Sequence, residues 1–159
     1  MSAENTNKYM LEAIKKAGEN IISGKGGPFG AVVVKDGKIL AAAANRVTST
    51  NDPTAHAEVV AIREACKILG TFDLSGCEIF ASCEPCPMCL GAIMWARIEK
   101  LYFASDRQDA ARAGFDDELF YSELGLTADK RALKPTQLMQ KEANLIFDKW
   151  LETVDKIPY

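Results

Sequence analysis

The spacing of apolar positions changes along the chain, and each change predicts a new element. From about Asn5 to Ser23 apolar residues recur at helical spacing, which predicts an amphipathic helix. The valine-rich run Phe29 to Lys35, the turn dipeptide Asp36-Gly37 and the run Lys38 to Asn45 predict a β-hairpin. The expected buried stripe of the first helix comprises Met10, Leu11, Ile14, Ala17, Ile21 and Ile22.

The middle of the chain alternates between helical and strand patterns. Asp52-Pro53 is typical of an N-cap followed by proline, and predicts a helix that reaches Leu69. Glu78 to Ser82 predicts a strand, Cys86 to Arg97 a buried helix, and Lys100 to Ser105 another strand. A helix between two strands, found twice, indicates crossover units and therefore an α/β fold with a partly parallel sheet.

The last third of the chain carries weaker patterns. Residues 106–134 are irregular apart from a short helix expected near Ala110. Pro135 is expected to precede a final helix that reaches about Val154. The length of 159 residues favours one compact domain covering residues 1–159.

Composition and charge exclude several classes of protein. The net charge of −3 argues against a broad basic surface for nucleic acid, although a local basic patch is compatible with it. The polar N-terminus lacks the apolar core of a signal peptide, and no apolar run is long enough to cross a membrane. Five cysteines without a signal peptide argue against a disulfide framework. The expected location is the cytoplasm.

The most informative chemistry lies in two short segments. His56 is followed two residues later by Glu58, and Cys86 and Cys89 flank Pro87-Met88 further along. One imidazole and two thiolates suit Zn²⁺, and three protein ligands leave the fourth tetrahedral position open, as in catalytic zinc sites. A carboxylate beside such a site is positioned to carry protons, so Glu58 is the candidate general acid and base.

The choice of the cysteine pair has an alternative. Cys83, Cys86 and Cys89 are evenly spaced, so Cys83 with Cys86 is the competing ligand pair. Helical spacing places Cys86 and Cys89 on one face of the first turn, which favours that pair. A helix N-terminus also lowers the pKa of a thiol near it. His56 and Glu58 can share a site only if the site lies over the helix end or across the pocket mouth.

At these residues the chain resembles the cytidine deaminase superfamily, and within it the bacterial guanine deaminases. The matching stretches are residues 26–32, 51–58 and 82–93. The resemblance implies a three-layer α/β/α sandwich around a five-stranded mixed sheet, zinc on His56, Cys86 and Cys89, and Glu58 as proton shuttle. Four strands are visible in the sequence pattern, and residues 131–134 are the weak candidate for the fifth.

The same stretches occur in deaminases that edit adenosine in tRNA, so two further features decide the expected substrate. Gly114-Phe115-Asp116-Asp117 is similar to a guanine deaminase stretch in which the second aspartate contacts the base. The chain also ends on Tyr159, as guanine deaminases end on a tyrosine that contacts substrate. A guanine pocket needs an acidic acceptor, an amide and an aromatic floor, for which Asp117, Asn45 and Phe29 are the candidates.

Three functions therefore compete. The leading one is zinc-dependent hydrolysis of guanine, a purine base, to xanthine and ammonia. The alternatives are a tRNA adenosine deaminase and a zinc-stabilised binding protein without turnover, in which Cys83 would be a fourth ligand. The resemblance also implies a homodimer in which residues from about 135 to 159 cross between subunits, so that Tyr159 of one chain completes the pocket of the other.

Overall fold

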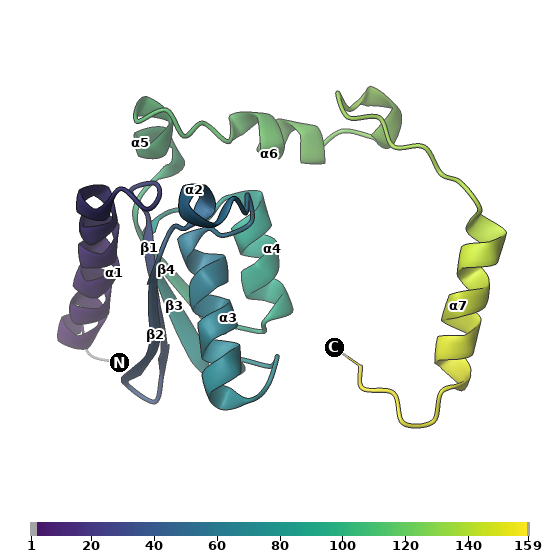
Figure 1. Ribbon diagram of the computed structural model, residues 1–159, viewed down its shortest axis with the longest axis horizontal. Coiled ribbons are helices and arrows are strands. Elements are labelled where there is room, and N and C mark those ends of the chain that lie inside the picture. The colour runs from purple at the N-terminus through teal and green to yellow at the C-terminus, as the bar shows by residue number, and fades with distance from the viewer. Residues whose placement is uncertain (1–2, 159) are drawn as a thin grey trace. The chain divides into compact units, whose positions relative to one another are not determined.

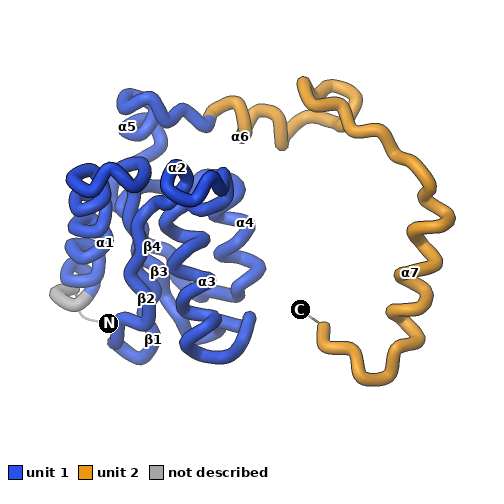
Figure 2. The backbone as a smooth tube through the Cα atoms, viewed as in Figure 1, with its two compact units in different colours: residues 1–117 blue, residues 118–159 orange. Residues whose placement is uncertain are grey.

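The structure, a computed structural model, describes residues 3–158. The chain divides into two compact units, Met1–Asp117 and Glu118–Tyr159, which Figure 2 shows in blue and orange. The first unit holds the sheet and the two metal-ligand motifs, His56-Ala57-Glu58 and Cys86 to Cys89.

The sheet of the first unit is mixed. Its strand order is β2 (Lys38–Ala44), β1 (Gly30–Lys35), β3 (Cys77–Cys83) and β4 (Lys100–Ser105). β1 is antiparallel to both of its neighbours, whereas β3 and β4 are parallel. The predicted hairpin is confirmed: Asp36 and Gly37 both adopt positive φ, 50° and 72°, as its tight turn requires.

Helices cover both faces of this sheet, so the predicted three-layer α/β/α arrangement is confirmed (Figure 1). α1 (Ala3–Ser23) lies on one face, and α3 (Ala57–Leu69) and α4 (Pro87–Trp95) lie on the other. The core under α3 and α4 includes Val33 and Ile79, and the core under α1 includes Val32 and Phe80. Neighbouring strand residues therefore point into opposite cores, as the pleat of a strand dictates. The shorter helices α2 (Val47–Thr50) and α5 (Arg107–Arg112) complete this unit.

The buried face of α1 differs from the predicted stripe. Ala13 and Ala17 are buried, but Ile14 is 45% exposed and Ile21 is 64% exposed. The reason is a close approach at β1, where a Cβ on Gly30 would collide with the backbone carbonyl oxygen of Ala13. Only small side chains fit such a contact, so the alanine face of the helix packs on the sheet. The buried residues of this face are Tyr9, Ala13, Ala17 and Asn20.

The start of α3 is also later than predicted. The expected N-cap, Asp52, instead closes a tight turn, where its Oδ1 accepts hydrogen bonds from the backbone N and the hydroxyl of Thr54, at 2.8 and 2.6 Å. The residue that caps α3 is His56, whose φ of −65° and ψ of 155° are extended. An aspartate binds the N–H groups that follow it in turns as well as in helices, which is why the local pattern was ambiguous.

The second unit contains α6 (Glu118–Leu124), a 3₁₀ helix (Ala128–Lys130) and α7 (Gln140–Glu152). The prediction of a fifth strand is wrong for the described residues, whose sheet has four strands. Residues 131–139 are irregular; the backbone N–H of Ala132 bonds to the Glu123 carboxylate, and Pro135 has no N–H to give. Within residues 3–158, no helix is both long and apolar enough to span a membrane.

Candidate metal centre and active site

Two helix N-termini carry the predicted metal ligands. His56 is the N-cap of α3, and Cys86 is the N-cap of α4, followed by Pro87 at the first helical position. Proline is favoured there because its missing N–H would have no partner in the helix. Cys89 lies one turn into α4 and is fully buried. The sequence thus directs one imidazole and two thiols to the positively polarised ends of two neighbouring helices.

The three ligand atoms meet in the structure. Nδ1 of His56 lies 3.5 Å from Sγ of Cys89 and 3.6 Å from Sγ of Cys86, and all three atoms lie within 4.8 Å of one another. Tetrahedral zinc, with bonds of about 2.0 Å to nitrogen and about 2.3 Å to sulfur, places these atoms about 3.6 Å apart. Both the donor set and its spacing therefore fit a zinc ion held by three protein ligands.

The two thiols of the cluster differ in acidity. The Cys89 thiol donates a hydrogen bond to Cys86, and His56 adds a second, so the pKa of Cys86 falls to about 4. The same interaction and burial raise the pKa of Cys89. Before metal binds, one thiolate is thus stabilised by one thiol and one imidazole. A zinc ion held here would need both sulfurs deprotonated, so its binding would displace a proton from Cys89.

Glu58 lies beside this cluster. It occupies the first turn of α3 and is only 8% exposed. Burial raises the pKa of its carboxyl group. The negative charge of Cys86 raises this pKa further, whereas the positive charge of His56 lowers it. Because His56 is the cap rather than a helical residue, the spacing of two does not force the side chains apart. This is the helix-end arrangement that the sequence required.

The competing ligand Cys83 lies outside the cluster. It ends β3, and its Sγ donates to the backbone oxygen of Asp106 at 3.6 Å. Burial, assisted by the negative charge of Glu58, raises the pKa of this thiol to about 11. Among the described residues, the three-ligand group is His56, Cys86 and Cys89. Cys83 therefore behaves as a buried thiol that stays protonated.

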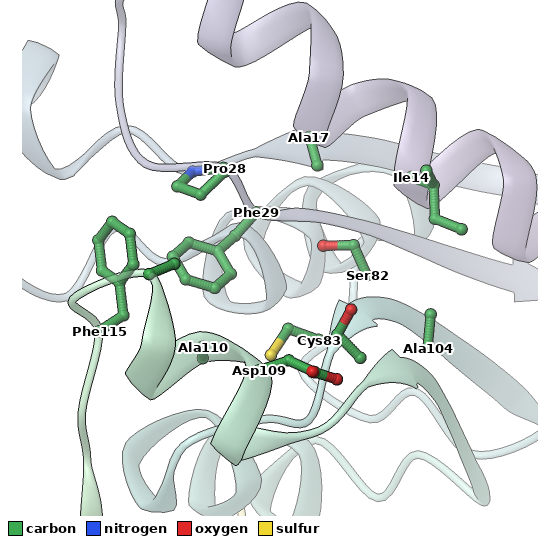
Figure 3. A pocket seen from close by; sticks show the side chains of 12 residues that line it. Ile14, Ala17, Pro28, Phe29, Ser82, Cys83, Ala104, Asp109, Ala110 and Phe115 are labelled. Atoms are coloured by element: carbon green, nitrogen blue, oxygen red, sulfur yellow. The ribbon is translucent and has the colours of Figure 1, made fainter.

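Asn45 and Phe29 lie on neighbouring strand ends. Asn45 follows β2 and is 6% exposed, and its backbone N–H donates to the Phe29 carbonyl at 3.0 Å. The Phe29 ring meets Phe115 edge to face, with ring centroids 4.9 Å apart. Phe29 and Phe115 also border a pocket of about 290 Å³ between α1, β3 and α5, into which Cys83 and Asp109 point (Figure 3). None of the three metal-ligand candidates lines that pocket.

Of the last two predicted site residues, Asp117 and Tyr159, the structure describes Asp117. Asp117 ends the first unit and is half-buried. Burial raises the pKa of its carboxyl group, and the negative charge of Cys86 raises it further, so Asp117 lies within the electrostatic field of the cluster. Tyr159 lies outside the described residues.

Two polar residues near this site were not predicted. Asn20 of α1 is 5% exposed, and Ser82 of β3 is 9% exposed. The Ser82 hydroxyl accepts a hydrogen bond from the Gly30 backbone N–H at 3.0 Å. A sequence signal existed for Asn20: it lies three residues after Ala17 on the alanine face of the helix. Asparagine is disfavoured in a helix interior unless its side chain has partners.

Residues 3–105 match the family described as the cytidine and deoxycytidylate deaminase zinc-binding region. The chain belongs to this family. The matched region contains both metal-ligand motifs and all four strands of the sheet, so the cytidine deaminase-like α/β fold is established.

Individual relatives refine the comparison. Guanine deaminase of Bacillus subtilis is 48% identical over 155 residues, covering 98% of this chain and 99% of that protein. Its crystal structure superimposes with a TM-score of 0.94 at 47% identity, covering 100% of this chain and 99% of the other. A guanine deaminase structure from Nitrosomonas europaea gives a TM-score of 0.67 at 34% identity, covering 74% of this chain and 67% of the other. The predicted resemblance to bacterial guanine deaminases is confirmed.

The tRNA deaminases match a shorter part of the chain. The tRNA-specific adenosine deaminase of Aquifex aeolicus is 50% identical over 78 residues, which is 49% of this chain and 52% of that protein. This match therefore covers about half of the chain. The similarity that extends through the C-terminal unit is to the Bacillus subtilis guanine deaminase.

Proposed function

We propose that this protein is a zinc-dependent guanine deaminase, which hydrolyses guanine to xanthine and ammonia. The observation that carries the proposal is similarity over the whole chain, including the C-terminal unit, to the Bacillus subtilis guanine deaminase. A match to part of the chain would not distinguish this activity from tRNA editing, because tRNA-specific adenosine deaminases are also similar to about half of the chain.

His56, Cys86 and Cys89 would hold one zinc ion per chain. Their donor types and separations fit tetrahedral zinc with three protein ligands. When bound, zinc supplies a Lewis acid that makes water a stronger nucleophile at neutral pH. The residues of the chain then have to hold the base in place and move protons.

Glu58 is the proposed proton carrier. Replacing the amino group of guanine by oxygen requires that one proton leave water, a ring nitrogen be protonated, and the departing amine gain a proton. One carboxyl group beside the reacting carbon can serve all three transfers in turn. Burial raises the pKa of Glu58, which brings the carboxyl closer to the range in which it both accepts and donates protons.

Three residues are the proposed contacts to the base. Asn45 Oδ1 accepts hydrogen bonds from the backbone N–H groups of Gly27 and Val47. Its amide nitrogen is then the group left to donate to a carbonyl oxygen of guanine. Asp117 is suited to accept from a ring N–H, and Phe29 supplies an aromatic face for the ring.

The exposed apolar side chains support a homodimer. In α4, Met94 and Trp95 are 70% and 66% exposed, and in α7 Phe147 and Leu151 are 68% and 70% exposed. Helices that expose so many large apolar side chains are typical of surfaces that another protein covers. A second copy is the proposed partner: residues from about 135 to 159 cross between subunits, and Tyr159 closes the partner's pocket. Both units would then belong to one functional deaminase domain in the cytoplasm.

A substrate panel tests the proposed function. Zinc-loaded protein is incubated separately with guanine, adenine, cytosine, guanosine and a tRNA anticodon stem-loop, and ammonia is measured. Guanine should be the best substrate, and Glu58→Gln should release no ammonia above background. Preferred deamination of the stem-loop would replace the proposal by tRNA adenosine editing. Zinc binding with no turnover of any substrate would replace it by a zinc-stabilised binding protein.

A further inference from the structure

We propose that Asn20 is a positioning residue. It holds Asn45 and the loop of residues 26–29 in the geometry that recognises the carbonyl group of the base. This inference rests on the proposed function only where it names guanine. Asn20 lies in α1, on the opposite face of the sheet from α3 and α4, which carry Glu58 and the cysteines. It would therefore act on the base through other residues.

The Asn20 side chain bridges two segments that are far apart in the sequence. Its Nδ2 donates to the backbone oxygen of Gly27 and to the backbone oxygen of Asn45, each at 2.8 Å. The side chain is almost completely buried, so water cannot replace these bonds easily. One amide group thus ties the loop before β1 to the residue after β2.

The two segments that Asn20 joins also form hydrogen bonds with each other. Oδ1 of Asn45 accepts from the Gly27 N–H at 3.3 Å and from the Val47 N–H at 3.1 Å. The Asn45 N–H donates to the Phe29 carbonyl at 3.0 Å. A movement of the loop is therefore transmitted both to the Asn45 amide and to Phe29, the two proposed contacts to the base on this side.

The loop has little freedom to adjust around a lost bond. A Cβ on Gly26 would collide with the backbone oxygen of Asn45, so the two segments touch along their backbones. Removal of the Asn20 amide takes one donor from each carbonyl oxygen. The Gly27 oxygen keeps the Phe29 N–H at 2.8 Å, whereas the Asn45 oxygen loses a buried hydrogen bond. The Asn45 oxygen would regain a partner only if the loop moved and admitted water, because an unpaired buried acceptor is costly.

The expected functional consequence is a loss of selectivity. While Asn45 Oδ1 is occupied by the two backbone N–H groups, the amide nitrogen faces the base as a donor. A donor favours guanine, which has a carbonyl oxygen at carbon 6, over 2,6-diaminopurine, which has an amino group there. If the loop moves, the Asn45 amide is free to rotate and to present its oxygen to that amino group.

The test compares Asn20→Ala and the volume-matched Asn20→Leu with Tyr9→Phe. Tyr9 is the matched control because its hydroxyl, also on α1, donates to the backbone oxygen of Gly37, at the hairpin turn of the sheet. Each variant is measured for zinc content, for kcat and KM with guanine and 2,6-diaminopurine, and for hydrogen exchange at the Gly27 and Val47 amides. If the cavity in Asn20→Ala prevents folding, the same measurements on Asn20→Leu decide the test.

The expected result has three parts. Both Asn20 variants keep their zinc, KM for guanine rises about tenfold or more while kcat changes less, and the preference for guanine over 2,6-diaminopurine narrows. Exchange at the Gly27 and Val47 amides accelerates in both variants but not in Tyr9→Phe. Unchanged exchange at these amides, or an equal loss of activity toward both bases, would overturn the proposal. A wild-type protein inactive on guanine would refute the proposed function instead, and the exchange measurement would still decide whether Asn20 holds the loop.

Discussion

Nδ1 of His56 lies 3.5 Å from Sγ of Cys89, although the two residues are 33 positions apart in the sequence. The contact exists because α3 and α4 begin at the same end of the sheet and pack side by side (Figure 1). His56 stands just before one helix, and Cys89 lies in the first turn of the other. The packing of two helix N-termini thus brings the imidazole and the thiol together.

Removal of a ligand should remove the metal. We expect about one zinc ion per wild-type chain and a large loss of zinc in His56→Ala and in Cys89→Ala, because two protein ligands hold zinc far more weakly than three. Metal content after dialysis against a weak chelator is the measurement. Cys83→Ala is the matched control and should keep its zinc, since that thiol bonds to the Asp106 backbone oxygen. Full zinc retention in either ligand variant would contradict the assignment.

Loss of the Glu58 carboxyl should stop turnover without disturbing the fold. Glu58→Gln keeps the shape of this buried side chain and removes its charge, so we expect unchanged zinc content and an unchanged or higher melting temperature. Each general acid or base step contributes about 10²–10⁴-fold, and Glu58 would serve several, so kcat should fall by at least that factor. Glu64→Gln, an exposed carboxylate on the same helix, is the control. A Glu58→Gln enzyme with near-normal kcat would disprove the shuttle role.

Asp117 should affect guanine recognition more than metal binding. We expect Asp117→Ala to lower kcat/KM for guanine about ten- to a hundredfold, because a ring N–H of the bound base would lose its acceptor. Steady-state kinetics and zinc content of the same preparation make the measurement. The neighbouring Asp116→Ala serves as the control. Equal losses in the two variants would point to a general disturbance of this segment instead of a contact to the base.

The proposed exchange of C-terminal segments can be tested by mixing two inactive proteins. One carries Glu58→Gln with an intact tail, and the other lacks residues 157–159 but keeps Glu58. After subunit exchange, a mixed dimer should regain one working site, built from the Glu58 of the truncated chain and the tail of its partner. Exchange is verified with differently tagged chains. Persistent inactivity despite verified exchange, or full activity of the truncated protein alone, would rule out the crossed tail.

Several elements could be predicted because their causes are local. Asp36-Gly37 specified the hairpin, since both positions need positive φ. Pro87 marked the start of α4, because proline suits only the first turn of a helix. The ligand types and spacings of His56, Cys86 and Cys89 indicated a zinc site before any fold was known. In each case the deciding interactions lie within a few residues of one another.

Other features depend on what each residue meets in the folded chain. The face that α1 buries was predicted only in part. Ala17 is buried as expected, but hydrophobicity also favoured Ile14 and Ile21, whereas the close approach to Gly30 requires a small residue and buries Ala13 instead. Helical spacing favoured Cys89 over Cys83 as a ligand, but the position of Cys83 outside the cluster, bonded to the Asp106 backbone oxygen, is a feature of the folded chain.

The sequence by itself determined the elements and the chemistry that they carry, and the tertiary structure decided which side chains work together. His56 reaches the cysteines only because two helix ends converge, and Asn20 reaches Asn45 only because α1 packs against the sheet. Backbone propensity and ligand chemistry act over a few bonds, so they can be recognised along the chain. Burial and long-range hydrogen bonds depend on the surface that each element meets, and that surface exists only when the whole sheet has formed.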